Sequence, residues 1–302
     1  MSSTLIPDPS MIGGVAKVPL ARLPQPEAVF TTRAERFDFL AVHSPNLAPY
    51  LRFLGALARV QARLSREAPD PVPISEDRIE LARVSRMPPL DRNDMRDDVT
   101  ATLQRLCDLM AEVDMPETAR LALAALAEAE PAERDWVILN VLADEIPPDS
   151  VAPHLLAAAA LQVVAAKRAE RLHVEQLVPI RTGICPACGG RPAVSMVTEN
   201  MGAEGARYCS CATCQTLWNE VRVKCTCCAS TKGITYRSVE TEEATVKAEI
   251  CRECGKWVKI LYQNKNPTLE PVADDVASLG LDLMMRDTEW ARGGFNPFLV
   301  GY

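Results

Sequence analysis

The chain has 302 residues, of which 48% are hydrophobic and 24% charged, with a net charge of −7 and a pI of about 5.2. This length allows about two domains with their own cores, and the acidic balance argues against non-specific nucleic-acid binding. The first 30 residues hold no basic segment followed by an apolar one, and the longest apolar stretch, 151–166, is too short and too interrupted to span a bilayer. We therefore expect a cytoplasmic protein without stable membrane insertion.

Residues 1–30 are rich in residues that break regular structure. They contain a Gly13-Gly14 pair and the prolines Pro7, Pro9, Pro19, Pro24 and Pro26. Such composition is typical of an extended or disordered segment. The sequence predicts an extended arm over residues 1–30.

Residues 31–178 show helical periodicity. Apolar residues recur at intervals of three and four in 47–58 and again in 99–113, and 151–172 is apolar on almost every side. We predict an all-α domain of six or seven helices, with 151–172 as its central buried helix. Cys107 is interpreted as a small buried hydrophobic residue. No histidine has a partner at a spacing that suggests catalysis, so we predict that the chain is not an enzyme.

Four Cys-x-x-Cys pairs dominate the second half. They are Cys185/Cys188, Cys211/Cys214, Cys225/Cys228 and Cys251/Cys254. A gap of 22 residues separates the first pair from the second and the third from the fourth, and a shift of 40 positions superimposes the first two pairs on the last two. This repeat indicates one small supersecondary unit used twice.

The spacing has a chemical explanation. A turn with two residues between cysteines directs both sulfurs to one point, and a second turn completes a tetrahedron of sulfur around zinc or iron. A disulfide framework is the alternative, but a reducing cytoplasm disfavours it. We predict two metal ions per chain, iron or zinc, one held by the first two pairs and one by the last two.

Details of the turns add further expectations. Gly189 and Gly255 follow two of the pairs, where a positive φ is often required, whereas the pairs 211/214 and 225/228 lack this glycine and are expected to form less regular turns. Cys209 and Cys227 are additional cysteines. We expect Cys209 to point away from the metal and Cys227 to lie unligated at a turn.

Beyond residue 178, β-branched and aromatic residues alternate with turns. The sequence predicts two tandem rubredoxin-like (zinc-ribbon-like) modules, at 179–222 and 223–265, each relying on its metal for folding free energy. Residues 266–302 are predicted to form a C-terminal helix and tail, with one helix from Ala273 to Trp290. The predicted fold class is α+β.

These motifs resemble those of the formate dehydrogenase accessory proteins of the FdhE type. The resemblance is strongest over 185–299, more than a third of the chain. It rests on Cys185-Pro-x-Cys188-Gly, Arg207-Tyr208, Val221-Arg-x-Lys224-Cys225, Ala248-Glu249-x-Cys251, Ala273-Asp-Asp275 with Leu279, and Asn296-Pro-Phe-Leu299. The family pattern contains the same eight cysteines in four pairs; Cys209 and Cys227 lie outside it.

The resemblance implies a cytoplasmic maturation factor with rubredoxin-like iron sites. Such a protein binds the selenocysteine- and molybdenum-containing catalytic subunit of respiratory formate dehydrogenase before export by the twin-arginine route. On this basis Asp274 and Asp275 are candidate partner contacts, although acidic residues at a helix start also stabilise the helix dipole.

Two other functions fit the same motifs. A rubredoxin-like electron carrier would use redox-active iron bound by four thiolates. A zinc-ribbon nucleic-acid adaptor is disfavoured, because residues 184–262 carry ten Lys and Arg against eight Glu and show no basic stripe.

Overall fold

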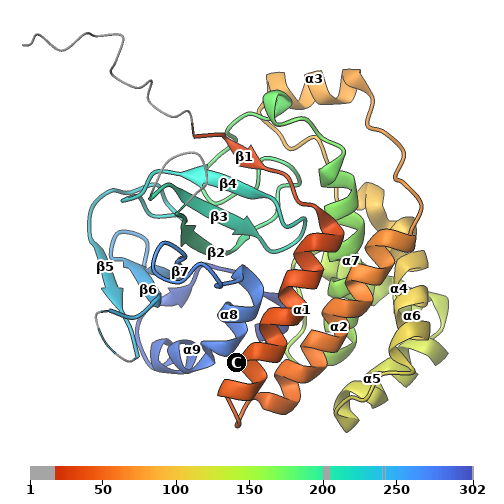
Figure 1. Ribbon diagram of the computed structural model, residues 1–302. Coiled ribbons are helices and arrows are strands. Elements are labelled where there is room, and N and C mark those ends of the chain that lie inside the picture. The colour runs from red at the N-terminus through yellow and green to blue at the C-terminus, as the bar shows by residue number, and fades with distance from the viewer. Residues whose placement is uncertain (1–17, 200–204, 240, 242, 301–302) are drawn as a thin grey trace, which may run out of the picture.

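The computed structural model describes residues 18–199, 205–239, 241 and 243–300. Most of the N-terminal helices occupy one side of the molecule, and the strands lie on the other side together with the two C-terminal helices (Figure 1). The helices are α1 (Pro26–His43), α2 (Ala48–Glu67), α3 (Glu76–Ser85), α4 (Arg96–Met110), α5 (Glu117–Glu128), α6 (Pro131–Ala143), α7 (Val151–Glu170), α8 (Pro271–Ala277) and α9 (Leu279–Arg286), with short 3₁₀ segments at Asn93–Met95, Val174–Gln176 and Pro297–Leu299. The predicted helical N-terminal region is confirmed.

Helix α7 is the centre of the helical region. It packs against α2, α4, α5 and α6, and Ala157, Ala159 and Ala160 on it are completely buried. Small side chains on several sides of one helix let neighbouring helices approach closely, which explains the alanine-rich sequence. Among the described residues, no helix is long and apolar enough to cross a membrane.

The predicted arm ends earlier than expected. Residues Ala21–Arg22 form strand β1, in which Ala21 pairs with Trp218, and α1 begins at Pro26. A proline in the first turn costs a helix no hydrogen bond, so Pro26 starts the helix where we expected irregular chain. The prediction is therefore wrong for 26–30, which belong to α1, whereas 18–25 are extended or irregular and 1–17 lie outside the described residues.

The strands form one continuous sheet. They are β2 (Pro192–Val197), β3 (Arg207–Cys211), β4 (Leu217–Glu220), β5 (Ile234–Arg237), β6 (Val246–Cys251), β7 (Lys256–Tyr262) and β8 (Ala291–Arg292), together with β1. The order is β1-β4-β3-β2-β7-β6-β5, with β8 also beside β7. A shift of 40 positions places β2, β3 and β4 on β5, β6 and β7, so each repeat is a three-stranded antiparallel unit.

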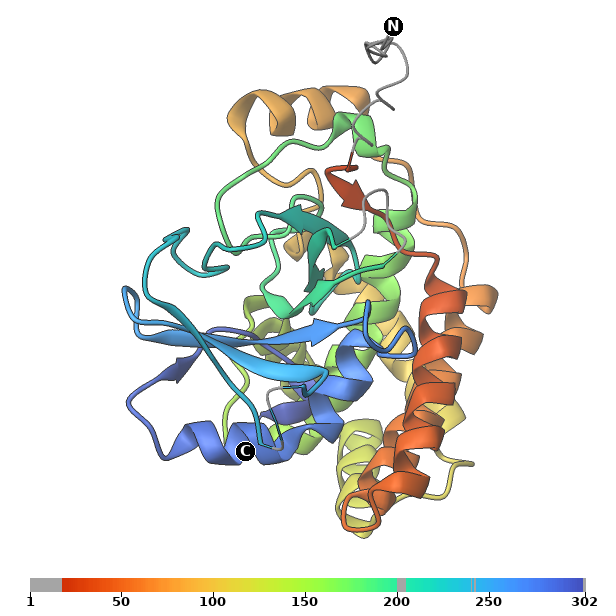
Figure 2. The same cartoon turned by 60° about the vertical axis from the view of Figure 1, so that its left-hand side comes forward.

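The two units are joined by a strand pair and by a buried ion pair. Strands β2 and β7 pair in parallel, with Ser195 opposite Ile260 (Figure 2). Arg207 of the first unit forms a 2.7 Å ion pair with Glu249 of the second, and both side chains are almost completely buried. Removing one partner of a buried ion pair leaves an uncompensated charge, so the two units depend on each other.

The C-terminal segment also differs from expectation. Instead of one helix over 273–290, the chain forms α8 and α9 with a break at Ser278, whose hydroxyl donates to the carbonyl of Asp274. The buried face of α9 carries Leu281 and Met285, whereas Leu283 is 39% exposed. Because the break rotates α9 relative to α8, a face extrapolated through 278 is wrong beyond it.

Candidate metal centres

The first four-cysteine group lies between the helices and the first unit of the sheet. Cys185 and Cys188 precede β2, and Cys211 and Cys214 flank the turn between β3 and β4. Their sulfurs lie within 4.8 Å of one another, with 3.6 Å between Cys185 and Cys214 and 3.5 Å between Cys188 and Cys211. All four residues are buried.

The second group repeats this arrangement 40 residues later. Cys225 and Cys228 precede β5, and Cys251 and Cys254 flank the turn between β6 and β7. The Sγ–Sγ distances are 3.7 Å for Cys225–Cys254 and 3.7 Å for Cys228–Cys251. Here Cys228 is exposed and Cys254 half-buried.

Both groups have the dimensions of a tetrahedral metal site. With a metal–sulfur bond of about 2.3 Å, the sulfurs of a tetrahedron are about 3.8 Å apart, close to the four distances above. Within the described chain neither group contains a histidine or carboxylate. Each group therefore fits one zinc or iron ion, and the grouping of sulfurs is the one that the repeat predicts.

All four cysteine turns adopt the same backbone conformation. The residue after each pair has a positive φ: 74° at Gly189, 62° at Gln215, 66° at Ala229 and 67° at Gly255. The turns without glycine are therefore as regular as the other two, contrary to our expectation. At Gln215 and Ala229 a side chain occupies the left-handed region, which costs roughly 1–2 kcal/mol.

Hydrogen bonds in the turns favour thiolate sulfur. The backbone N–H groups of Thr213 and Cys214 point at Cys211 Sγ, 3.4 Å away in each case. Burial by itself raises the pKa of Cys211, but hydrogen bonds from neighbouring thiols bring it well below the usual value. A hydrogen bond from Cys227 likewise lowers the pKa of Cys225 to about 4. One thiol in each group is thus favoured as the thiolate that a metal requires, whereas burial raises the pKa of Cys185 in the first group and that of Cys254, to about 12, in the second.

A buried polar network fixes the first group to the helices. Arg33 of α1 donates to Gln215, at 2.6 Å, and to Glu270 at the start of α8, at 3.0 Å. Gln162 of α7 donates to the carbonyl of Ala212, within the second cysteine turn, at 2.9 Å. Helices α1 and α7 thereby contact one metal turn directly, and the start of α8 is joined to it through Arg33, all by buried side chains.

The sequence analysis missed this network. A signal was present, since Gln162 interrupts an otherwise apolar helix and a buried amide needs hydrogen-bond partners. The pairs within the network could not be found from sequence, because their members are far apart in the chain; Arg33 and Gln215, for example, are separated by 182 positions.

The second group has a different environment. A small cluster of Ala248, Ile250, Trp257, Leu281 and Met285 forms the nearby core of that unit, separate from the large helical core that includes the first group. No described helix of the N-terminal region contributes to this cluster. The second group is therefore supported mainly by its own unit and the C-terminal segment.

The additional cysteines lie outside both groups. Cys209 is completely buried in β3, and burial raises its pKa far above the usual range. Cys227 lies in the turn between Cys225 and Cys228, and a Cβ added to Gly293 would lie 2.4 Å from its sulfur. Among the described residues neither belongs to a set of converging ligand atoms.

Asp274 and Asp275 are not displayed at the surface. Asp274 forms a bidentate contact with Arg36 at 2.7 and 2.9 Å, and Asp275 lies 2.7 Å from Arg292 and 3.0 Å from Lys259. Both are buried. Burial alone would raise the pKa of Asp275, but Arg292 and Lys259 lower it. Both candidate partner contacts are therefore turned into the protein, and the geometry favours structural roles for them.

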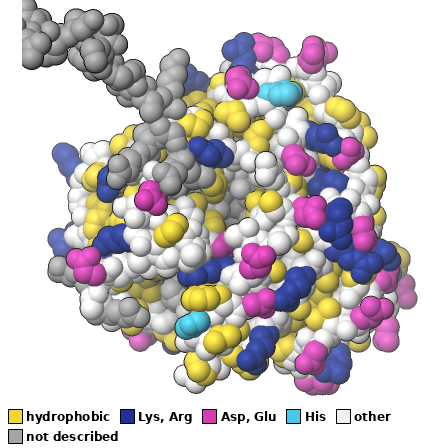
Figure 3. Space-filling model, in the orientation of Figure 1, with side chains coloured by type: hydrophobic (Ala, Val, Ile, Leu, Met, Phe, Trp, Pro, Cys, Tyr) yellow, Lys and Arg dark blue, Asp and Glu magenta, His cyan; other side chains and the backbone are white. Residues whose placement is uncertain are grey.

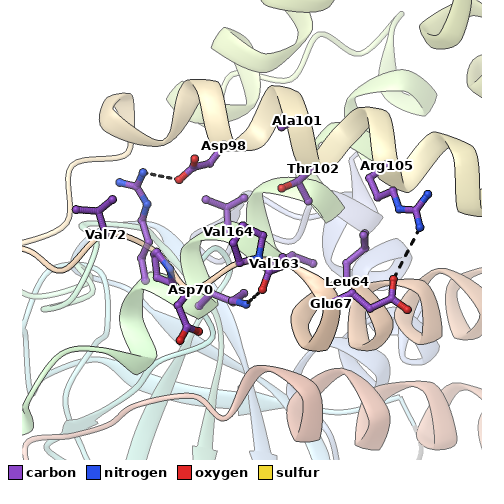
Figure 4. Close-up of a pocket in the computed structure, with 15 residues that line it drawn as sticks. Leu64, Glu67, Asp70, Val72, Asp98, Ala101, Thr102, Arg105, Val163 and Val164 are labelled. Atoms are coloured by element: carbon purple, nitrogen blue, oxygen red, sulfur yellow. Dashed lines mark hydrogen bonds and ion pairs between the residues drawn. The ribbon is translucent and has the colours of Figure 1, made fainter.

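A separate cavity of about 510 Å³ lies among α2, α4 and α7 (Figure 4). Leu64, Val163 and Val164 line it, and its rim carries paired charges such as Arg168 with Asp98, at 2.6 Å. None of the cysteines lines it. Cys107 is buried elsewhere, and burial raises its pKa to about 11, which fits an unreactive core thiol.

The fold and the two sites define a class: a helical protein joined to a pair of rubredoxin-like four-cysteine units. Family models for the FdhE N-terminal, central and C-terminal domains match residues 18–182, 184–222 and 223–299. The chain belongs to the FdhE family.

Individual relatives cover nearly the whole chain. The "Protein FdhE homolog" of Rhizobium meliloti (strain 1021) is 54% identical over 304 residues, which is 99% of each chain. The "Protein FdhE" of Salmonella dublin is 36% identical, covering 93% of this chain and 91% of its own. The crystal structure of the FdhE protein from Pseudomonas aeruginosa matches with a TM-score of 0.81 and 30% identity, over 93% of this chain and 99% of that one.

Proposed function

We propose that this protein is a cytoplasmic accessory factor that binds the catalytic subunit of formate dehydrogenase during its maturation and catalyses no reaction itself. The observation that carries the proposal is membership of the FdhE family along the whole chain, helical region and both units included. The two four-cysteine groups would each hold iron or zinc through Cys185, Cys188, Cys211 and Cys214 and through Cys225, Cys228, Cys251 and Cys254.

The asymmetry between the groups supports a binding role. A site whose ligands are all buried stabilises the fold, whereas one with an exposed ligand can also respond to a partner. The surface supports the same role: on the face of the helices seen in Figure 3, positive and negative side chains are intermixed, which is not the single-sign stripe that a nucleic-acid adaptor needs.

The test is genetic and biochemical. A strain lacking this protein should assemble little active formate dehydrogenase, and the wild-type gene should restore it. The purified protein should also retain the catalytic subunit in a pull-down. Normal formate dehydrogenase activity in the deletion strain, together with no retention, would refute the proposal.

An electron carrier is a second candidate, and the exposed Cys228 favours it, because an exposed ligand gives electrons a short route to a partner. A visible spectrum of protein purified without oxygen distinguishes the two cases. Iron–thiolate sites absorb and change on reduction, whereas zinc sites are colourless. Reversible reduction that is required for formate dehydrogenase activity would favour the carrier; zinc at full activity would exclude it.

A further inference from the structure

A pocket lies between the two units, directly beside the exposed ligand Cys228. We name it the junction pocket; its volume is about 550 Å³, and its walls include Arg181, Arg191, Thr226, Cys228, Lys256 and Gly293. Arg191 and Pro192 at the start of β2 and Lys256 at the start of β7 place it where the units meet.

The pocket wall is cationic, although the chain as a whole carries a net charge of −7. Three of its lining side chains are positive and none is acidic. Arg181 and Lys256 are exposed and have no ion pair with any described carboxylate. A four-thiolate site with a divalent metal carries a net charge of about −2 and would lie nearby. Among the described residues, none of the three cationic side chains bonds to a cysteine sulfur.

The third cation is held in position. The Arg191 guanidinium stacks 4.4 Å from the centre of the Phe295 ring and donates to the carbonyl of Asp144 at 3.2 Å. Its Nε lies 3.7 Å from the Asp144 carboxylate. A guanidinium ordered in this way loses little entropy when it binds a further carboxylate.

The shape of the pocket depends on two glycines. A Cβ at Gly183 would lie 2.7 Å from the carbonyl oxygen of Thr226, and one at Gly293 would lie 2.4 Å from Cys227 Sγ. Both segments therefore approach the third cysteine turn more closely than other residues permit. Thr226 in that turn is 1% exposed, so the turn is closely packed where it forms part of the pocket wall.

From these observations we infer that the junction pocket binds an acidic segment of the client protein, with a carboxylate between Arg181, Arg191 and Lys256, and so brings the client against the second metal site. Charge complementarity identifies the occupant: the pocket offers Arg181 and Lys256, which have no ion pair with a described carboxylate, beside the ordered Arg191, and Arg presents paired donors to carboxylates. This inference rests on the proposed function and adds the surface and chemistry of the contact.

The test compares two charge-reversed proteins. Arg181→Glu with Lys256→Glu changes the pocket, and Arg52→Glu with Arg237→Glu makes the same change in net charge at exposed, unpaired positions outside it. We expect the pocket variant to lose about tenfold or more in affinity for the catalytic subunit at low salt, and the control to lose less than about threefold. Metal content and unfolding temperature should match wild type in both.

Further variants make the outcome decisive. Arg181→Gln with Lys256→Gln removes charge without adding repulsion. This variant should lose less affinity for the catalytic subunit than the Glu variant, and its binding should depend less on salt than that of wild type. A photo-crosslinking residue at Thr182, which lines the pocket, should capture the client, whereas one at exposed Thr100 should not. If wild type binds the client and the pocket variants bind equally well, the pocket inference is overturned and the proposed function stands. If wild type itself does not bind, both are overturned.

Discussion

The two four-cysteine groups have the same spacing, turn conformation and sulfur distances, yet different surroundings. Around the first, buried residues of α1, α7 and α8 form a hydrogen-bonded network, and all four cysteines belong to the large core. Around the second, Cys228 reaches the surface and the nearby apolar cluster is small. Identical ligand chemistry thus serves stability in one place and leaves a ligand accessible in the other.

The largest expected effect comes from ligand removal at equivalent positions of the repeat. Cys188→Ser and Cys228→Ser each remove one thiolate, from a site whose metal-binding free energy is on the order of 10 kcal/mol. We expect each variant to bind one metal ion, but only Cys188→Ser to lower the unfolding temperature of the helical region, because its site lies in the shared core. Metal analysis, limited proteolysis and calorimetry measure this. Equal effects on the helices would show that the sites do not differ.

The buried network should give the next largest effect. Arg33→Met leaves the Glu270 carboxylate buried without its cation, which typically costs about 3–5 kcal/mol. A chelator should also remove the first metal faster from this variant, while the rate at the second site stays unchanged. Arg52→Met on exposed α2 surface is the matched control, within about 0.5 kcal/mol of wild type. A loss below 1 kcal/mol at Arg33 would contradict the anchoring role.

Turn strain offers a smaller, stabilising effect. Ala229 is exposed with a φ of 66°, so Ala229→Gly should relieve strain and stabilise the second unit by about 1 kcal/mol after the entropic cost of glycine. Ala101→Gly, at an exposed position in α4, should instead destabilise by about 1 kcal/mol. Denaturant titration that follows Trp257, which lies in the second unit, measures the stability change caused by Ala229→Gly. If both substitutions changed stability in the same direction, this would be evidence against strain at Ala229.

The smallest effect concerns the additional cysteines. Cys227→Ser and Cys209→Ser should both retain two metal ions per chain, since neither sulfur belongs to a converging group. Cys209→Ser should lose about 1–3 kcal/mol of stability, because it buries a hydroxyl without a partner; half-buried Cys227 should tolerate the change. A metal content near one in either variant would mean that the ligand sets are wrong.

The sequence was sufficient for most features that depend on local spacing. Periodicity located the helical region and its central helix, and the 40-residue repeat placed eight cysteines in two groups. These features follow from neighbours within a few tens of residues, because a turn and a hairpin bring the ligands together without help from the rest of the chain. The same local logic misjudged Pro26, which starts a helix, and Ser278, which interrupts one.

Only the tertiary structure decided how the two units differ. The parallel pairing of β2 with β7, the Arg207–Glu249 ion pair and the contact of Arg33 with Gln215 join residues 42 to 182 positions apart. The tertiary structure also buries Asp274 and Asp275. Asp274 pairs there with Arg36, and Asp275 pairs with Lys259 and Arg292. Buried charges require partners, and a sequence shows that a charge exists but not which distant residue neutralises it. Burial of one metal group and exposure of the other follow from those distant contacts.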